Sequence, residues 1–402
     1  MTFLSDPISS IGNWLENFLI GLGLAPNFSA LIVTAIGAFV LAAFGLMIVL
    51  LLIWFERKAV ARMQDRLGPN RIGPYGIFQS VADTLKLLTK EYITPAGADK
   101  VVYNLAPLFA VMAVLGIWAV IPFAATVYGS DINVGALYIV AVGAIGVLAI
   151  IMAGWSSNNK YALLGAFRVV SQLLCYEVPL VITLLIPVML AGSMGMNAIV
   201  MAQDTWFIFL APLGFLIFLI ASIAEVGRAP FDLLEADSEI VAGFNIEYSG
   251  MKFGMFFVAE FLHAFTIGAV VATLFLGGWR GPGAETYPIL GTIYFFIKAF
   301  IVYFIVVWAR GTFPRIRIDQ MLNFSWKFLT PLALVLLIVM AVQLKLVEGS
   351  PTWVYVTSSF AVNVLIAFGT IHLLRSFARR ERKRVSEERP LATAPESDFQ
   401  QI

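Results

Sequence analysis

Six carboxylates lie within 23 residues of one segment of the chain, and only Arg228 and Lys252 oppose them there. The six are Glu225, Asp232, Glu235, Asp237, Glu239 and Glu247. Carboxylates buried side by side cannot all ionise, so one or more of their pKa values should rise, which suits groups that hold and pass protons. The segment also carries many large apolar residues, among them Phe231 and Phe244. This mixture favours a partly buried proton site, with a solvated acidic loop as the alternative.

Four more ionisable residues lie inside long apolar runs: Glu177, Glu260, His263 and Lys298. A charged side chain at the centre of a bilayer costs at least about 2.5–3.5 kcal/mol. Each of the four must therefore pair with an opposite charge, become neutral or face an aqueous cavity. A structural ion pair is one explanation, whereas several such groups together indicate a proton relay.

The composition places these groups in a membrane. Of the 402 residues, 60% are hydrophobic and 13% are charged, and the mean hydropathy is +0.89. A soluble core cannot bury that much apolar surface. The composition therefore excludes a secreted enzyme, a nucleic-acid-binding protein and a disordered scaffold.

Few residues could hold a redox cofactor. The chain has one cysteine, Cys175, and two histidines, His263 and His372. These numbers exclude a disulfide framework, an iron–sulfur cluster and a cysteine zinc site, and we predict no metal site. The sequence contains no G-x-G-x-x-G and no P-loop. Any redox or nucleotide chemistry would therefore use cofactors on other chains.

The apolar runs predict an all-α, polytopic membrane bundle of about nine transmembrane helices. The predicted spans are 30–55, 101–124, 133–154, 162–193, 206–224, 253–277, 288–309, 327–346 and 352–375. With nine spans, 23 of the 26 Lys and Arg residues fall on one side of the membrane. The positive-inside rule then places the N-terminus outside and the C-terminus in the cytoplasm.

The connections divide the chain into three parts. Residues 1–29 are expected to form an interfacial segment, 30–376 the bundle, and 377–402 a basic, disordered cytoplasmic tail. Three cytoplasmic loops, 56–100, 225–252 and 310–327, are longer than a simple channel needs. Within the first, 77–93 has the pattern of an amphipathic helix, which either lies on the membrane surface or frames a lipid-side entrance.

Four stretches together resemble the H-type membrane subunits of proton-translocating NADH:quinone oxidoreductase (respiratory complex I), the family that includes the mitochondrial counterpart, subunit 1. They are Trp54–Glu91 with Gln64-x-Arg66-x-Gly68-Pro69-Asn70, Gly154–Glu177 with Trp155-Ser156-Ser157-Asn158-Asn159-Lys160-Tyr161, Ala224–Tyr248 with Arg228-x-Pro230-Phe231-Asp232, and Trp308–Gln320 with Arg310-Gly311-Thr312-x-Pro314-Arg315-x-Arg317. The resemblance runs from about residue 30 to 346.

The resemblance implies a membrane subunit that docks the hydrophilic redox arm, forms part of the quinone-access tunnel and couples quinone reduction to proton translocation. It implies that quinone is the substrate and that FMN and the iron–sulfur clusters sit on partner subunits. Expected partners are the arm subunits that carry the terminal cluster and the quinone head site, small membrane subunits, antiporter-like subunits and the lipid bilayer, with no nucleic acid. The expected location is a bacterial plasma membrane, crossed several times.

The resemblance also implies roles for individual residues. The proton-coupling acids would be Glu177, Glu225, Asp232, Glu235, Asp237, Glu239 and Glu260. The residues of the quinone tunnel and its mouth would be Arg57, Arg66, Asp83, Lys86, Arg228, Phe231, Arg315 and Arg317.

Two other functions compete with this one. A stand-alone secondary transporter would show internal repeats and paired broken helices, and the sequence has neither. The related subunit of a membrane-bound hydrogenase shares parts of these motifs and differs mainly in its partner chains. The completeness of the first and third motifs favours the quinone oxidoreductase.

Overall fold

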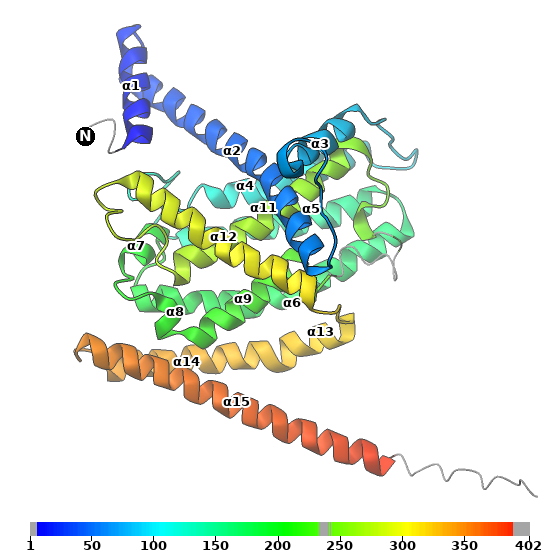
Figure 1. The fold of residues 1–402 in the computed structure, drawn as a ribbon, viewed down its shortest axis with the longest axis vertical. Helices are drawn as coiled ribbons and strands as arrows, with labels where there is room; N and C mark the ends of the chain where they lie inside the picture. Colours follow the sequence, from blue (N-terminus) through cyan, green and yellow to red (C-terminus); the bar gives the residue numbers. More distant parts are fainter. Residues whose placement is uncertain (1–5, 233–240, 242, 389–402) are drawn as a thin grey trace, which may run out of the picture.

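The computed structural model describes residues 6–232, 241 and 243–388, and in this part every regular element is helical (Figure 1). In chain order the elements are α1 (Pro7–Gly21), α2 (Pro26–Met63), η1 (Pro74–Gly76), α3 (Gln79–Thr89), α4 (Lys100–Trp118), α5 (Gly135–Ser156), α6 (Lys160–Ala191), α7 (Met196–Met201), α8 (Phe207–Leu210), α9 (Pro212–Val226), η2 (Gly243–Asn245), α11 (Gly250–Phe275), α12 (Pro288–Thr312), α13 (Ile318–Phe324), η3 (Ser325–Leu329), α14 (Thr330–Leu346) and α15 (Thr352–Glu388). The predicted all-α membrane bundle is confirmed.

Eight helices of the described part are long and apolar enough to cross a membrane. The helices α13, η3 and α14 form one continuous span, Ile318–Leu346. The predicted span 206–224 differs, because it consists of the short helices α8 and α9. Pro212 has no backbone N–H and cannot continue α8. The Nδ2 of buried Asn363 on α15 donates to the Leu210 carbonyl at this break, at 3.0 Å.

Helix α11 is the centre of the bundle. In its most apolar stretch 72% of the residues are buried, more than in any other described span. Gly268 lets α11 approach α12 closely, because a Cβ there would come within 2.7 Å of the Ala299 carbonyl oxygen. On another face, the indole Nε1 of Trp118 on α4 donates to Thr266 Oγ1 at 2.7 Å. A central helix bounded by α2, α4, α9 and α12 can hold ionisable groups away from lipid.

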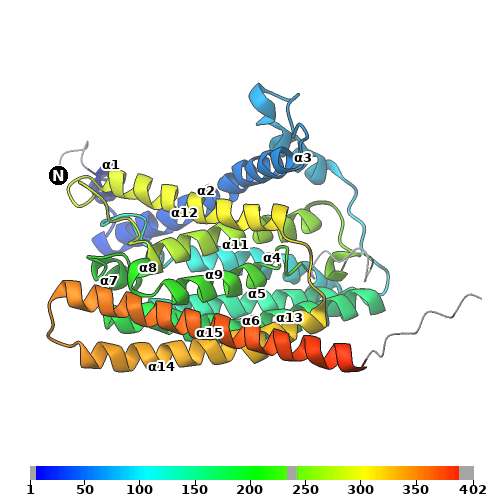
Figure 2. The same ribbon diagram turned by 60° about the horizontal axis from the view of Figure 1, so that its bottom comes forward.

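Helices at the two ends of the chain lie at the rim of the bundle (Figures 1 and 2). Helix α2 crosses one side at a slant and leads into α3, which falls within the predicted amphipathic segment 77–93. Helices α14 and α15 run side by side along the opposite side, where only 11% of the apolar stretch of α15 is buried. Helix α15 continues to Glu388, so its helical backbone passes the boundary expected at residue 376.

Replacing Thr266 by Val should destabilise the bundle, because it leaves the buried Trp118 N–H without an acceptor, at a cost of about 1–3 kcal/mol. Thr273→Val on the same helix is the matched control, since Thr273 Oγ1 donates only to the Val270 carbonyl of its own turn. The readout is the midpoint of heat-induced loss of this chain from the detergent-solubilised complex. Equal midpoints for the two variants would contradict a structural role for this bond.

Candidate functional site

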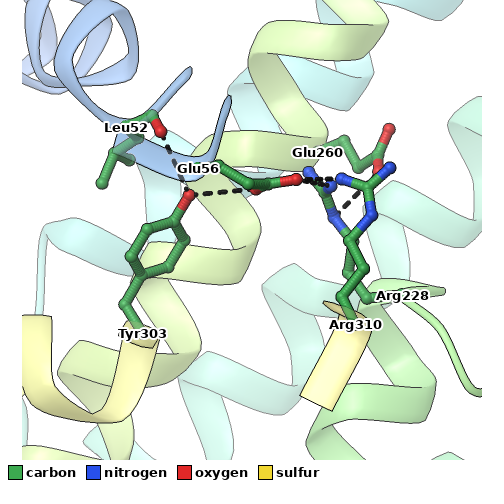
Figure 3. Close-up of polar contacts among 6 residues, drawn as sticks. All are labelled: Leu52, Glu56, Arg228, Glu260, Tyr303 and Arg310. Atoms are coloured by element: carbon green, nitrogen blue, oxygen red, sulfur yellow. Dashed lines mark hydrogen bonds and ion pairs between the residues drawn. The ribbon is translucent and has the colours of Figure 1, made fainter. Parts of the chain in front are cut away.

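A buried cluster of charges joins four helices at the centre of the site (Figure 3). Arg228, which follows the C-terminus of α9, donates from Nη1 to Glu56 Oε1 on α2 at 2.8 Å. Its Nε lies 3.0 Å from Glu260 Oε1 on α11. Arg310 on α12 also donates to Glu56 Oε1. Two carboxylates thus face two guanidinium groups, and the side chains of Glu56 and Arg228 are only 6% and 3% exposed.

The remaining polar contacts fix the geometry of Glu56. The Tyr303 hydroxyl on α12 lies 3.2 Å from Glu56 Oε2, so both carboxylate oxygens are engaged. Tyr303 and Arg310 are seven residues apart and share one face of α12. The guanidinium of Arg228 also stacks over the Phe261 ring, at 4.5 Å from its centroid. Because each group is held by its neighbours, the cluster is a rigid junction between α2, α9, α11 and α12.

On one side of this cluster an open cavity of about 590 Å³, here called the surface cavity, lies between the C-terminal ends of α2 and α12. Glu56 and Arg310 of the cluster contribute to its wall. The predicted tunnel residues Arg57 and Arg66 line it as well. Its lining therefore carries three arginines and one carboxylate, and its net charge is positive.

Arg57, which lines the surface cavity, forms an ion pair with Asp83 on α3. Burial raises the pKa of the Asp83 carboxyl, but hydrogen bonds from Arg57 and Gln79 outweigh this effect and leave the pKa below its ordinary value of 3.8. Asp83 is thus ionised at neutral pH, and its pairing is lost only as the pH falls through that lowered pKa. Lys86, on the same helix, is exposed.

On the other side of the cluster, two smaller cavities penetrate the bundle. The central cavity, of about 110 Å³, is lined by Glu260 and also by Glu225 and His263. The inner cavity, of about 40 Å³, is lined by Glu225, His263 and Glu177. Glu225 and His263 line both of these cavities, and Glu260 joins the central cavity to the charge cluster. Since Glu56 joins the cluster to the surface cavity, the polar groups form one series from the surface cavity to Glu177.

The other predicted site residues that the structure describes do not line the central or the inner cavity. Phe231 is buried against Tyr176, with ring centroids 5.2 Å apart, and its carbonyl accepts from Gln172 Nε2. Asp232 and Arg315 are half-buried, and each interacts with other residues of the chain. Arg317 is exposed at the N-cap of α13. The predicted acids Glu235, Asp237 and Glu239 lie outside the described residues.

The site residues predicted from the sequence did not include Glu56, Tyr303 or Arg310. The sequence identified His263 only as an ionisable residue within an apolar run. Glu56 carries one signal, as an acid at the end of an apolar run directly before basic residues. The seven-residue spacing of Tyr303 and Arg310 is a second signal. Arg310 also fits the positive-inside pattern, and that simpler explanation hides its pairing with Glu56.

Comparison with known proteins identifies the family of this chain. The model of a family described as NADH dehydrogenase matches residues 36–341. The chain belongs to this family. It is 48% identical to the H subunit of NADH-quinone oxidoreductase from Dehalococcoides mccartyi over 348 residues, which cover 86% of this chain and 96% of the relative.

Two further relatives agree. The chain is 52% identical to the corresponding subunit of NADH-quinone oxidoreductase from Carboxydothermus hydrogenoformans over 287 residues, covering 71% of this chain and 81% of that one. It is 49% identical to the corresponding subunit from Geobacillus kaustophilus over 289 residues, covering 71% and 86%. The resemblance stated from the sequence is therefore confirmed, and the chain is a multi-pass membrane member of an oxidoreductase family.

Glu56→Gln should weaken the junction by about 3–5 kcal/mol, because it leaves the buried Arg228 and the partly exposed Arg310 with one carboxylate between them. Glu348→Gln is the control, since the Lys345–Glu348 pair has side chains that are 83% and 69% exposed and should contribute almost nothing. The measurement is the amount of this chain retained in the solubilised complex as temperature rises. Identical retention curves for the two variants would refute the central role of Glu56.

Proposed function

We propose that this chain forms, with partner subunits, the quinone-access tunnel of a proton-pumping NADH:quinone oxidoreductase, and that its carboxylates couple quinone reduction to proton translocation. The observation that carries the proposal is the series of shared residues. Glu56 belongs to both the surface cavity and the charge cluster, Glu260 to the cluster and the central cavity, and Glu225 to the central and inner cavities.

The surface cavity suits the approach of a quinone. Arg57 in its wall pairs with Asp83 on α3, and α3 exposes large apolar side chains such as Leu85 and Leu88. An amphipathic helix with an apolar face lies at a membrane interface, where a hydrophobic quinone is dissolved. The cationic lining then favours the negative charge that the quinone head acquires when it is reduced at the partner subunit's site beyond this cavity.

The cluster is suited to transmit that charge. Groups held in a low-dielectric site interact much more strongly than they would in water. A negative charge that arrives in the surface cavity attracts Arg310 and Arg228. This attraction weakens the ion pairs that the two arginines form with Glu56 and Glu260. Glu260 then takes up a proton more readily, and the central and inner cavities pass the change on to Glu225 and Glu177.

The end of the bundle that carries the loops is proposed to dock the hydrophilic arm, which holds FMN, the iron–sulfur clusters and the quinone head site. An open polar cavity of about 850 Å³ lies there, lined by Asp99, Lys160 and Glu247. Trp155 beside it is 67% exposed, and large aromatic residues are common at protein interfaces. The other faces would meet small membrane subunits, antiporter-like subunits and the lipid of a bacterial plasma membrane.

Glu225→Gln should leave assembly intact, because it keeps the volume of the side chain, but should lower quinone-linked turnover and proton pumping by about tenfold, because an amide cannot hold a proton. Both are measured in inverted membrane vesicles, with oxidation of NADH by an artificial acceptor as the test of assembly. Glu285→Gln, at an exposed carboxyl in the α11–α12 connection, is the matched control. Full pumping by Glu225→Gln would overturn the coupling role.

Asp83→Ala should lower quinone reduction several-fold and spare the artificial-acceptor activity, because it releases Arg57 in the wall of the surface cavity. Asp83 is ionised well above its lowered pKa, so the loss should be the same at every pH from about 6 to 8. Glu91→Ala, at an exposed acid beyond α3, is the control. Equal loss of both activities would indicate an assembly defect instead.

A further inference from the structure

Of the residues that the structure describes, three line both the central and the inner cavity and form the boundary between them. They are Gly143 on α5, Glu225 on α9 and His263 on α11. Gly143 contributes no side chain, and a Cβ there would already lie 3.8 Å from Glu225 Oε1. The polar side chains at this boundary are therefore Glu225 and His263, and a proton that passes from one cavity to the other meets them.

The linings of both cavities suit water molecules that relay protons. The inner cavity, at about 40 Å³, exceeds the roughly 10–15 Å³ that one water needs, and the central cavity is larger. The inner cavity is lined by the buried hydroxyl of Ser222, which has no hydrogen-bond partner within the described chain. Thr266 and Glu177 add further polar groups to the same wall. A water there would find the two to four partners that it requires.

His263 lies on the same face of α11 as Glu260, which precedes it by three residues in the helix. Among the described contacts, no hydrogen bond or ion pair holds its imidazole ring to another side chain. The ionisable groups that share cavities with it are Glu225 from α9, Glu177 from α6 and Glu260 from α11, whereas the other lining residues of α4 and α5 are apolar or glycine. The ring can therefore exchange protons with either cavity.

We infer that His263 is a proton-carrying residue of the coupling path, and that it passes protons between the central and inner cavities beside Glu225. This inference rests on the function proposed above. In the step, one ring nitrogen accepts a proton from a carboxylic acid or water in one cavity, which forms an imidazolium. The other nitrogen then releases its proton to a carboxylate in the other cavity, directly or through water. The donor acid becomes a carboxylate, the acceptor carboxylate becomes an acid, and the ring returns to its neutral form as the other tautomer.

The test uses the complete respiratory complex in inverted membrane vesicles and compares His263→Gln with His372→Gln. His372 is the only other histidine and is exposed on α15, so this control makes the same chemical change away from the cavities. His263→Gln should lower quinone-linked turnover and proton pumping by at least about fivefold, and artificial-acceptor activity and subunit content should stay the same. His372→Gln should change none of these.

A titratable replacement separates proton transfer from packing. His263→Glu restores a group that can hold a proton, so its turnover should recover part of the loss seen in His263→Gln. Equal loss in both variants would assign His263 a purely structural role, and normal turnover in His263→Gln would overturn the inference directly. If His263→Gln fails to assemble, the smaller His263→Asn, which cannot overfill the site, replaces it with the same expected result.

The two proposals can fail separately. If Glu225→Gln loses pumping and His263→Gln does not, the coupling path stands and His263 is not part of it. If neither variant loses pumping, the proposed coupling function itself is wrong.

Discussion

The arrangement of the whole site depends on the engagement of both oxygens of one carboxylate, that of Glu56. Its Oε1 accepts from Arg228 and Arg310 and its Oε2 faces the Tyr303 hydroxyl, and the residue is buried. The buried guanidinium of Arg228 could not remain at this depth without Glu56 and Glu260, because an unpaired buried charge is strongly destabilising. The requirement for charge balance therefore fixes how the ends of α2, α9, α11 and α12 meet.

That meeting point also determines where the cavities lie. The junction closes the bundle between the surface cavity and the central cavity, so it separates a solvent-facing, cationic space from a buried, acidic one. In the proposed coupling, charge added on the surface side shifts the contacts within this junction. Arg228 is the pivot, since it contacts Glu56 and Glu260 at once. The proposed coupling of quinone chemistry to protons uses this property.

Much of the fold followed from the sequence, because the length of an apolar run and the positions of Lys and Arg are local properties. The exception was 206–224, where Pro212 breaks the run into α8 and α9, and the buried Asn363 that satisfies the break comes from a helix 153 residues away along the chain. The charge cluster was harder to predict for the same reason. Glu56 lies 172 residues from Arg228 and 254 from Arg310, and no spacing pattern specifies such pairings.

Individual acids were easier to predict than their arrangement. The cost of a charge in a membrane marks Glu177 and Glu260 as functional or paired residues, and the crowding of carboxylates in one segment marks Glu225. Which of them would face a cavity, and which would pair with Arg228, depends on helix packing. The family match favours the oxidoreductase over the stand-alone transporter, and the roles of the single residues remain proposals.

The central claim is that quinone reduction changes the protonation of carboxyl groups inside this chain. The most direct test is an infrared difference spectrum of the intact complex, recorded between its oxidised and quinol-reduced states and compared with that of the Glu225→Gln variant. The account predicts a change in the carbonyl-stretch band of a protonated carboxyl group that is lost in the variant. A carboxyl region identical in the two proteins would contradict it.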